Sequence, residues 1–492
     1  MNGHKDVVEL LLTHQADVDK ADNEGWTPLH IACSNGYKDL SEFLLTHKAN
    51  VNQENKNGQT PLTLACVNGH KDVVELLLTH QAHVDKADDV GWTPLHMTCS
   101  KGYKDLSELL LTHKANVNQQ NRNGWIPLTL ACENGHKDVV ELLLTHQADV
   151  DKADDVGWTP LHMACSKGFK DLSELLLTHK ANVNQENKNG QTPLTLACMN
   201  GHKDVVELLL THQADVDKAD NEGWTPLHIA CSNGYKDLSE FLLTHKANVN
   251  QENKNGHTPL TLACVNGHKD VVELLLTHQA DVDKADHVGW TPLHMACSKG
   301  FKDLSELLLT HKANVKQENK KGQTPLTLAC ANGHKDVIEL LLRHQADVDK
   351  TDNMGWTPLH MACSKGYKDV VELLLTHQAD VDKADDVGWT PLHMACRKGF
   401  KDLSELLLTH KANVKQENKK GQTPLTLACA NGHKDVIELL LRHQADVDKT
   451  DNMGWTPLHM ACSKGYKDVV ELLLTHQADV DKADDVGWTP LH

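Results

Sequence analysis

The sequence predicts an all-α solenoid of about fifteen 33-residue units, each a helix, a turn, a second helix and a hairpin. Three residue registers carry this prediction in a chain of 492 residues. All 15 prolines recur in steps of 33 from Pro28, and all 14 cysteines lie five residues after a proline, from Cys33 onward. The 30 glycines fill two further registers. A strict period of this length is typical of stacked repeats, so we expect a single array over residues 1–492.

The first helix of a unit has clear start and stop signals, as in the unit 88–120. Gly91 tolerates a positive φ and marks a turn. Thr93 is a suitable N-cap, and Pro94 fits the first helical position, where an N–H is not needed. Gly102 predicts a left-handed end to this helix.

The second helix is predicted over KDLSELLLTH, because its apolar residues recur at helical spacing. Leu106, Leu109, Leu110 and Leu111 form this pattern, and the segment KANVNQ that begins at Lys114 leads into the next hairpin. Neither helix could bury its apolar face alone. Stacking of neighbouring units would bury both faces and give a quasi-one-dimensional core.

The repeated motif TPLH-x-A, followed by glycine, a Val/Leu-rich helix and A-D-V-D or A-N-V-N, resembles the ankyrin repeat. The resemblance covers essentially the whole chain, and it implies an array that binds other proteins. The chain departs from the ankyrin pattern after the second helix, where glycine is usual. Gln15, Lys48 and their counterparts stand there, and a non-glycine residue in a left-handed cap costs on the order of 1 kcal/mol. Six units also read PLT rather than PLH.

Charge and hydropathy narrow the possible partners and the location. The formal net charge is −19, and no run of Lys or Arg resembles a nucleic-acid-binding arm, so we expect no nucleic-acid partner. No apolar run approaches the length of a membrane span, and the first residues lack the apolar core of a signal peptide. One cysteine per unit would place successive cysteines about 8–10 Å apart, too far for a disulfide, which favours a reducing compartment, and no CxxC spacing of a zinc site occurs. We therefore expect a cytoplasmic, monomeric array.

Both ends of the chain fall inside a repeat. Residues 1–4 match residues 199–202 in mid-unit, and the chain stops at TPLH. Solenoids usually carry polar capping repeats, and none is recognisable here. We therefore expect a fragment of a longer gene product. Residues 301–393 are also identical to residues 400–492, which indicates a recent duplication or an assembly error.

The recurrent titratable residues have simpler explanations than catalysis. One cysteine per unit fits a small buried side chain on the first helix. The 34 histidines lie in registers that would keep equivalent residues too far apart to share one metal ion. Adjacent carboxylates such as Asp88 and Asp89 fit a solvated turn, and no GxSxG, P-loop or GxGxxG motif occurs. We expect no enzyme activity, metal or cofactor.

Tryptophan occupies a single register, between the hairpin glycine and the usual N-cap threonine. Five units carry Gln or His there instead, so the position is not a core slot, which would not accept all three residue types. Each Trp either is displayed as an interface anchor or packs on a neighbouring hairpin, and its polar N–H allows both. The ten residues are Trp26, Trp92, Trp125, Trp158, Trp224, Trp290, Trp356, Trp389, Trp455 and Trp488.

The resemblance implies partner binding on the concave face formed by the hairpins and first helices. We expect a protein-binding scaffold or adaptor with extended or multivalent partners of basic or mixed surface. The alternatives are a mechanical tether on a membrane channel, or a targeting arm of an enzyme module, encoded outside this segment. The residues expected to bind are Trp26, Trp92, Trp125, Trp158, Trp224, Trp290, Trp356, Trp389, Trp455, Asp89, Val90, Ser100 and Lys101.

Overall fold

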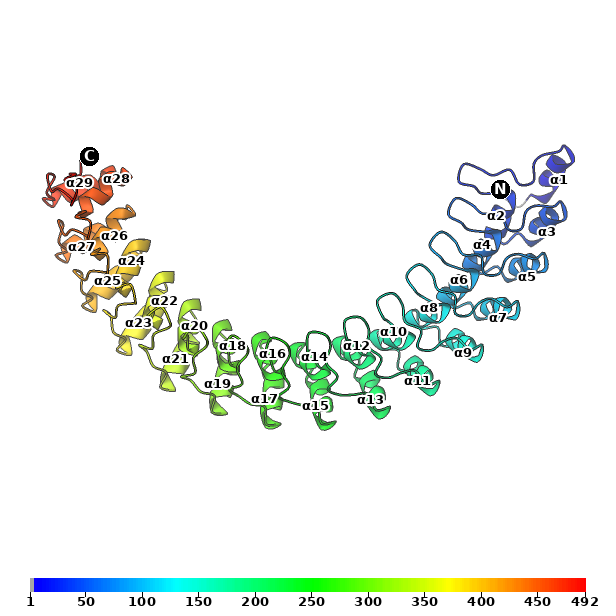
Figure 1. Cartoon of the computed structure of the whole chain (residues 1–492), viewed down its shortest axis with the longest axis horizontal. Coiled ribbons are helices and arrows are strands. Elements are labelled where there is room, and N and C mark those ends of the chain that lie inside the picture. The colour runs from blue at the N-terminus through cyan, green and yellow to red at the C-terminus, as the bar shows by residue number, and fades with distance from the viewer. Residues whose placement is uncertain (1–3) are drawn as a thin grey trace. The chain divides into compact units, whose positions relative to one another are not determined.

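A computed structural model describes residues 4–492 as paired helices joined by turns and hairpins (Figure 1). This part of the chain contains 29 helices and no strand, which confirms the all-α prediction. Its contacts divide it into two compact units. The first unit runs to Ala230 and includes Asp237–Asn248, and the second contains Cys231–Lys236 and Val249–His492.

Fourteen short helices are the first helices of their repeats, and each begins at the proline of the 33-residue period. Consecutive first helices pack against one another within each unit. They are α2 Pro28–Ser34, α4 Pro61–Asn68, α6 Pro94–Lys101, α8 Pro127–Glu133, α10 Pro160–Lys167, α12 Pro193–Met199, α14 Pro226–Ser232, α16 Pro259–Asn266, α18 Pro292–Lys299, α20 Pro325–Asn332, α22 Pro358–Lys365, α24 Pro391–Lys398, α26 Pro424–Ala430 and α28 Pro457–Lys464.

The other fifteen helices are the second helices, each nine residues long and each beginning at a lysine. They are α1 Lys5–Thr13, α3 Lys38–Thr46, α5 Lys71–Thr79, α7 Lys104–Thr112, α9 Lys137–Thr145, α11 Lys170–Thr178, α13 Lys203–Thr211, α15 Lys236–Thr244, α17 Lys269–Thr277, α19 Lys302–Thr310, α21 Lys335–Arg343, α23 Lys368–Thr376, α25 Lys401–Thr409, α27 Lys434–Arg442 and α29 Lys467–Thr475.

A reciprocal capping box fixes the start of the first helix. In α10 the Thr159 side chain accepts a hydrogen bond from the His162 N–H, and the His162 ring accepts one from the Thr159 N–H at 3.1 Å. These two bonds satisfy backbone donors that the first helical turn leaves without partners. The helix ends at Gly168, which is left-handed at φ 77°, as its glycine predicts.

The second helix buries one face and ends in the unusual cap that the sequence contains. In α11, Leu172, Ser173, Leu176 and Leu177 are buried. Lys180, just after this helix, has a φ of 66°. All fifteen Gln or Lys residues in this register are left-handed, with φ between 62° and 67°. The usual cap geometry is therefore retained without glycine.

Two kinds of contact alternate between successive repeats. Where a PLH repeat precedes a PLT repeat, histidines link them: His162 Nε2 lies 3.1 Å from the Gln191 carbonyl, and His202 Nε2 lies 3.1 Å from the Ser166 carbonyl. Where a PLT repeat comes first, an aromatic ring makes the contact. The Phe169 ring lies so close to Gly135 that a β-carbon there would approach it to 3.0 Å. The side chains thus fix the spacing of adjacent repeats.

Candidate functional site

An Asx-type turn positions each tryptophan at the base of its hairpin. The Asp88 carboxylate accepts the N–H of Val90 at 3.0 Å and the N–H of Trp92 at 2.8 Å. Asp88 is buried, whereas the adjacent Asp89 is exposed at the hairpin tip. The two adjacent carboxylates therefore have different surroundings, and the first one shapes the turn.

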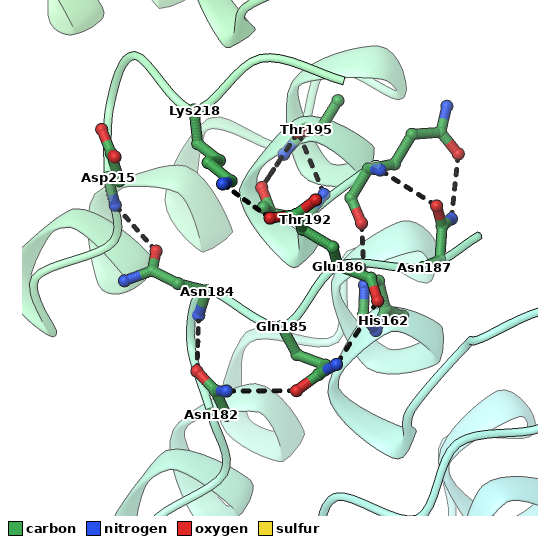
Figure 2. Close-up of polar contacts among 11 residues, drawn as sticks. His162, Asn182, Asn184, Gln185, Glu186, Asn187, Thr192, Thr195, Asp215 and Lys218 are labelled. Carbon is green, nitrogen blue, oxygen red and sulfur yellow. Dashed lines mark hydrogen bonds and ion pairs between the residues drawn. The ribbon is translucent and has the colours of Figure 1, made fainter. Parts of the chain in front are cut away.

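Neighbouring hairpins are joined by backbone and side-chain hydrogen bonds. The Asp89 N–H donates to the Asn57 carbonyl at 3.0 Å, and the Arg122 N–H donates to the Val90 carbonyl at 3.2 Å. Figure 2 shows a second link, in which the Asp215 N–H donates to Asn184 Oδ1 at 2.9 Å. These bonds order the hairpins into one continuous row within each unit.

An ion pair also links hairpins of successive repeats at several positions. In Figure 2, Lys218 Nζ lies 2.6 Å from Glu186 Oε1. Equivalent pairs join Lys86 to Glu54 and Lys350 to Glu318, each at 3.0 Å. Because all these side chains are partly exposed to solvent, each pair contributes little to stability. Their charges nevertheless cancel locally, so other charged residues determine the character of the face.

The tryptophans are neither fully buried nor fully displayed. Nine are half-buried, and Trp488 is 56% exposed. The ring of Trp26 lies 6.1 Å from the ring of His30, and the other tryptophans of PLH repeats lie equally near the histidine of their own repeat. Trp125 Nε1 donates to Asp154 Oδ2 of the next repeat at 2.9 Å. Each ring therefore has a side-chain neighbour in its own repeat or in the next one.

The other residues that the sequence assigned to binding lie beside the tryptophan register. Val90 is 58% exposed and, with the exposed Asp89, forms a hairpin tip. Lys101 is exposed at the end of α6, and Ser100 is half-buried. The Gln and His residues that replace Trp are also half-buried. Within each unit, the hairpin tips, the tryptophan register and the ends of the first helices thus form one face, called here the hairpin face.

Two grooves open on the hairpin face of the second unit. The Trp389 groove has a volume of about 480 Å³ and is lined by Met354, Trp356, Met361, Ser364, Lys365, Asp385, Val387, Trp389, Met394, Arg397 and Lys398. The Trp455 groove has a volume of about 780 Å³ and is lined by Lys419, Lys420, Gln422, Asp451, Asn452, Met453, Trp455, Met460, Ser463 and Lys464. Each groove combines tryptophan and methionine with lysine.

Sequence reasoning named the tryptophans of these grooves and the registers of their hairpin tips and first-helix ends, but not the first-helix methionines Met361, Met394 and Met460. Met354 and Met453 are 62% and 63% exposed at hairpin tips, and Arg397 lies over the Trp389 ring at 5.2 Å from its centroid.

The buried cysteines and the buried TPLH histidines do not line either groove. Cys165 is buried, and burial raises the pKa of its thiol to about 12, against a smaller lowering by the Ser173 hydroxyl. Burial also lowers the pKa of His162 to about 4, so this ring is neutral at pH 7. Within residues 4–492, no three His, Cys, Asp or Glu side chains are grouped to hold a metal ion. No helix of this part is long and apolar enough to span a membrane.

Comparison with known proteins places this fold in a family. The family model for ankyrin repeats in three copies matches residues 1–55, 42–121, 81–154, 97–187, 161–253, 213–286, 240–319, 279–353, 306–385, 378–451 and 445–492. These matches cover the whole length, and the repeating helix pairs agree with them. The chain belongs to the ankyrin repeat family, which is a class of interaction modules.

Individual relatives match only a short part of the chain. Protein phosphatase 1 regulatory subunit 27 from Homo sapiens is 49% identical over 35 residues, and the protein of the same name from Mus musculus gives the same values. Each match covers 7% of this chain and 23% of the relative. The likeness amounts to about one repeat of the array.

Proposed function

We propose that this chain is a non-catalytic scaffold or adaptor that binds partner proteins on its hairpin face. The observation that carries the proposal is the row of half-buried tryptophans, each held by an Asx turn beside an exposed hairpin tip. Tryptophan is enriched among the residues that dominate binding energy, and an anchor that is already ordered loses little entropy on binding. The fourteen cysteines, all of them free thiols, fit a reducing, cytoplasmic location.

The repeated face suits extended or multivalent partners. Successive binding positions in one chain raise the effective concentration of the second contact once the first has formed. The net charge of −19 favours partners of basic or mixed surface. In the first unit, exposed acidic tips such as Glu24, Asp89, Asp155 and Glu222 support such a partner.

The proposal is tested by selecting ligands on the intact chain. A display library of random 16-residue peptides is selected on the full chain and on two variants with Trp→Gln changes. Glutamine stands naturally at this register, as at Gln59 and Gln191, so the change should preserve the fold. One variant carries the change at Trp26, Trp92 and Trp158, and the other at Trp356, Trp389 and Trp455.

We expect the full chain to enrich peptides and each Trp→Gln variant to lose the peptides that bind its own unit, at unchanged helical circular dichroism. The matched control replaces exposed second-helix residues, Glu108→Ala and Glu174→Ala, and should keep the selected peptides. If no peptide is enriched, or if both tryptophan variants retain all of them, the hairpin face is not the binding face.

A further inference from the structure

The charge of the hairpin face differs between the two units. Two pairs of positions in each repeat show this difference in charge. They are the two residues before the hairpin glycine, such as 89–90, and the two residues before the first-helix glycine, such as 100–101. In the first unit these positions hold five cationic and five acidic side chains, whereas in the second they hold ten cationic and only two acidic ones. The ten include the pairs Lys320-Lys321 and Lys419-Lys420 and the adjacent Arg397 and Lys398, all of them exposed. The net charge of the chain therefore conceals a basic face in its second unit.

This basic face coincides with the Trp389 and Trp455 grooves. Lys365, Arg397 and Lys398 line the first, and Lys419, Lys420 and Lys464 line the second. The floors are apolar, with Met361 and Met394 in the first groove and Met460 in the second. An apolar groove framed by cations has the layout of a site for an apolar side chain flanked by negative charge.

The acidic residues of the grooves do not cancel this arrangement. The Asp385 carboxylate accepts the N–H groups of Val387 and Trp389 at 2.9 and 2.8 Å, and Asp385 is only 8% exposed. Asp451 accepts the equivalent bonds from Met453 and Trp455, and it is also 8% exposed. Both carboxylates belong to turns, so the charged groups that face solvent in each groove are cations.

We propose that the Trp389 and Trp455 grooves bind an acidic peptide segment of a partner protein. A Leu, Met or Phe side chain of the segment enters the apolar floor, and flanking Asp or Glu carboxylates pair with the surrounding lysines and with Arg397. A guanidinium over an indole ring holds the ring in place and still offers N–H donors to a carboxylate. This inference rests on the proposed protein-binding function and names the partner chemistry for the second unit.

An acidic peptide fits the grooves better than a nucleic acid. Bases bind to proteins chiefly by stacking on open aromatic faces, and Arg397 covers one face of Trp389. Flexible methionines instead adapt to aliphatic and aromatic side chains of proteins. The net charge of −19 also repels a long polyanion. A short acidic segment interacts mainly with the cations of the groove, because salt screens the more distant charges.

The test compares the composition of selected peptides between the full chain and a charge-reversed variant. The variant Lys365→Glu/Arg397→Glu/Lys398→Glu/Lys419→Glu/Lys420→Glu/Lys464→Glu reverses the charge of both grooves and changes only exposed side chains, so folding should be preserved. The matched control, Lys101→Glu/Lys167→Glu, changes the same register in the first unit. We expect peptides with several Asp or Glu residues around an apolar residue to be enriched on the full chain and on the control. The charge-reversed variant should lose them.

One enriched acidic peptide is then titrated by fluorescence anisotropy at 50 and 300 mM NaCl. We expect at least tenfold weaker binding to the charge-reversed variant and to Trp389→Gln/Trp455→Gln, and weaker binding at the higher salt. Oligo-dT of 12 nucleotides serves as the competing polyanion.

Three results would overturn the inference. Enriched peptides could be basic or neutral, or acidic peptides could bind the charge-reversed variant equally well. Oligo-dT could also displace the peptide and bind the chain more tightly than the peptide does. In each case, peptides that bind the first unit would still support the proposal that the chain is a protein-binding scaffold. The absence of any enriched peptide would contradict both.

Discussion

At the scale of single residues, the cap after each second helix is a recurrent strained position. Gln345 has a φ of 62° and Lys312 a φ of 67°, in a region that L-residues avoid and glycine enters freely. The sequence predicted a free-energy cost wherever a non-glycine residue adopts the left-handed cap, and the residues at all fifteen positions adopt it.

Replacing such a residue by glycine should stabilise the array. Gln345→Gly removes the left-handed strain but adds entropy to the unfolded chain, so we expect a net gain of roughly 0.5–1 kcal/mol per site. Urea unfolding followed by circular dichroism measures it. The control Gln345→Ala keeps the strain and should give no gain. A loss of stability in Gln345→Gly would show that the Gln side chain contributes more than the backbone strain costs.

The histidine of the TPLH motif is a second residue-scale feature, and it makes stability depend on pH. Burial lowers the pKa of His294 to about 4, against smaller raising effects of the Gln323 carbonyl and the Asp286 carboxylate. Burial likewise lowers the pKa of His96 and His393 to about 4. These rings are neutral in the fold and become protonated on unfolding below pH 6.5.

Stability should therefore be complete above about pH 6.5 and decrease as the pH falls from 6.5 towards 4, because the unfolded chain then binds more protons. At pH 5 the loss should be on the order of 2 kcal/mol per buried histidine. Thermal unfolding at pH 7 and pH 5 measures this loss.

The variant His294→Thr/His393→Thr recreates the threonine capping box of the PLT repeats. It should be less stable at pH 7, because it loses bonds such as that from His294 Nε2 to the Gln323 carbonyl. Its melting temperature should also fall less between pH 7 and pH 5. An equal fall in both proteins would assign the acid sensitivity to other groups.

At the scale of elements, a ladder of side-chain oxygens joins successive hairpins. Asn250 Oδ1 accepts the Asp281 N–H at 2.8 Å, and Asp283 Oδ1 accepts the Asn314 N–H at 2.8 Å. The next position is Lys316, whose side chain has no acceptor. Near this gap Ala346 is half-buried, whereas Ala313 and Ala379 are buried at 7% exposure.

Lys316→Asn should supply an oxygen that accepts the Asp347 N–H. The new hydrogen bond should stabilise the second unit by about 0.5–1.5 kcal/mol, the usual net value of one hydrogen bond. Amide hydrogen exchange at Asp347 should slow in the variant. Lys316→Ala removes the charge without supplying an acceptor, so exchange at Asp347 should remain fast. If both variants slow exchange equally, the lysine charge rather than the missing oxygen weakens this junction.

At the scale of the whole molecule, the fold was predictable because each repeat contains the residues that begin and end its helices. Thr93, Pro94 and Gly102 predicted the bounds of α6 to within a residue, and the 33-residue period repeats them. The grooves were harder to predict, because they need side chains from two successive repeats. The Trp389 groove brings Trp356 and Met361 of one repeat beside Trp389 of the next, and no single repeat reveals that juxtaposition.

The central claim is that the hairpin face, and not the second-helix face, binds partners. Hydrogen–deuterium exchange of the full chain, with and without a selected peptide, tests it most directly. We predict slower exchange in the hairpins and first helices, at residues 353–365 and 386–398 for an acidic peptide, with no change in α23 and α25. Protection confined to α23 and α25, with unchanged hairpins, would contradict it.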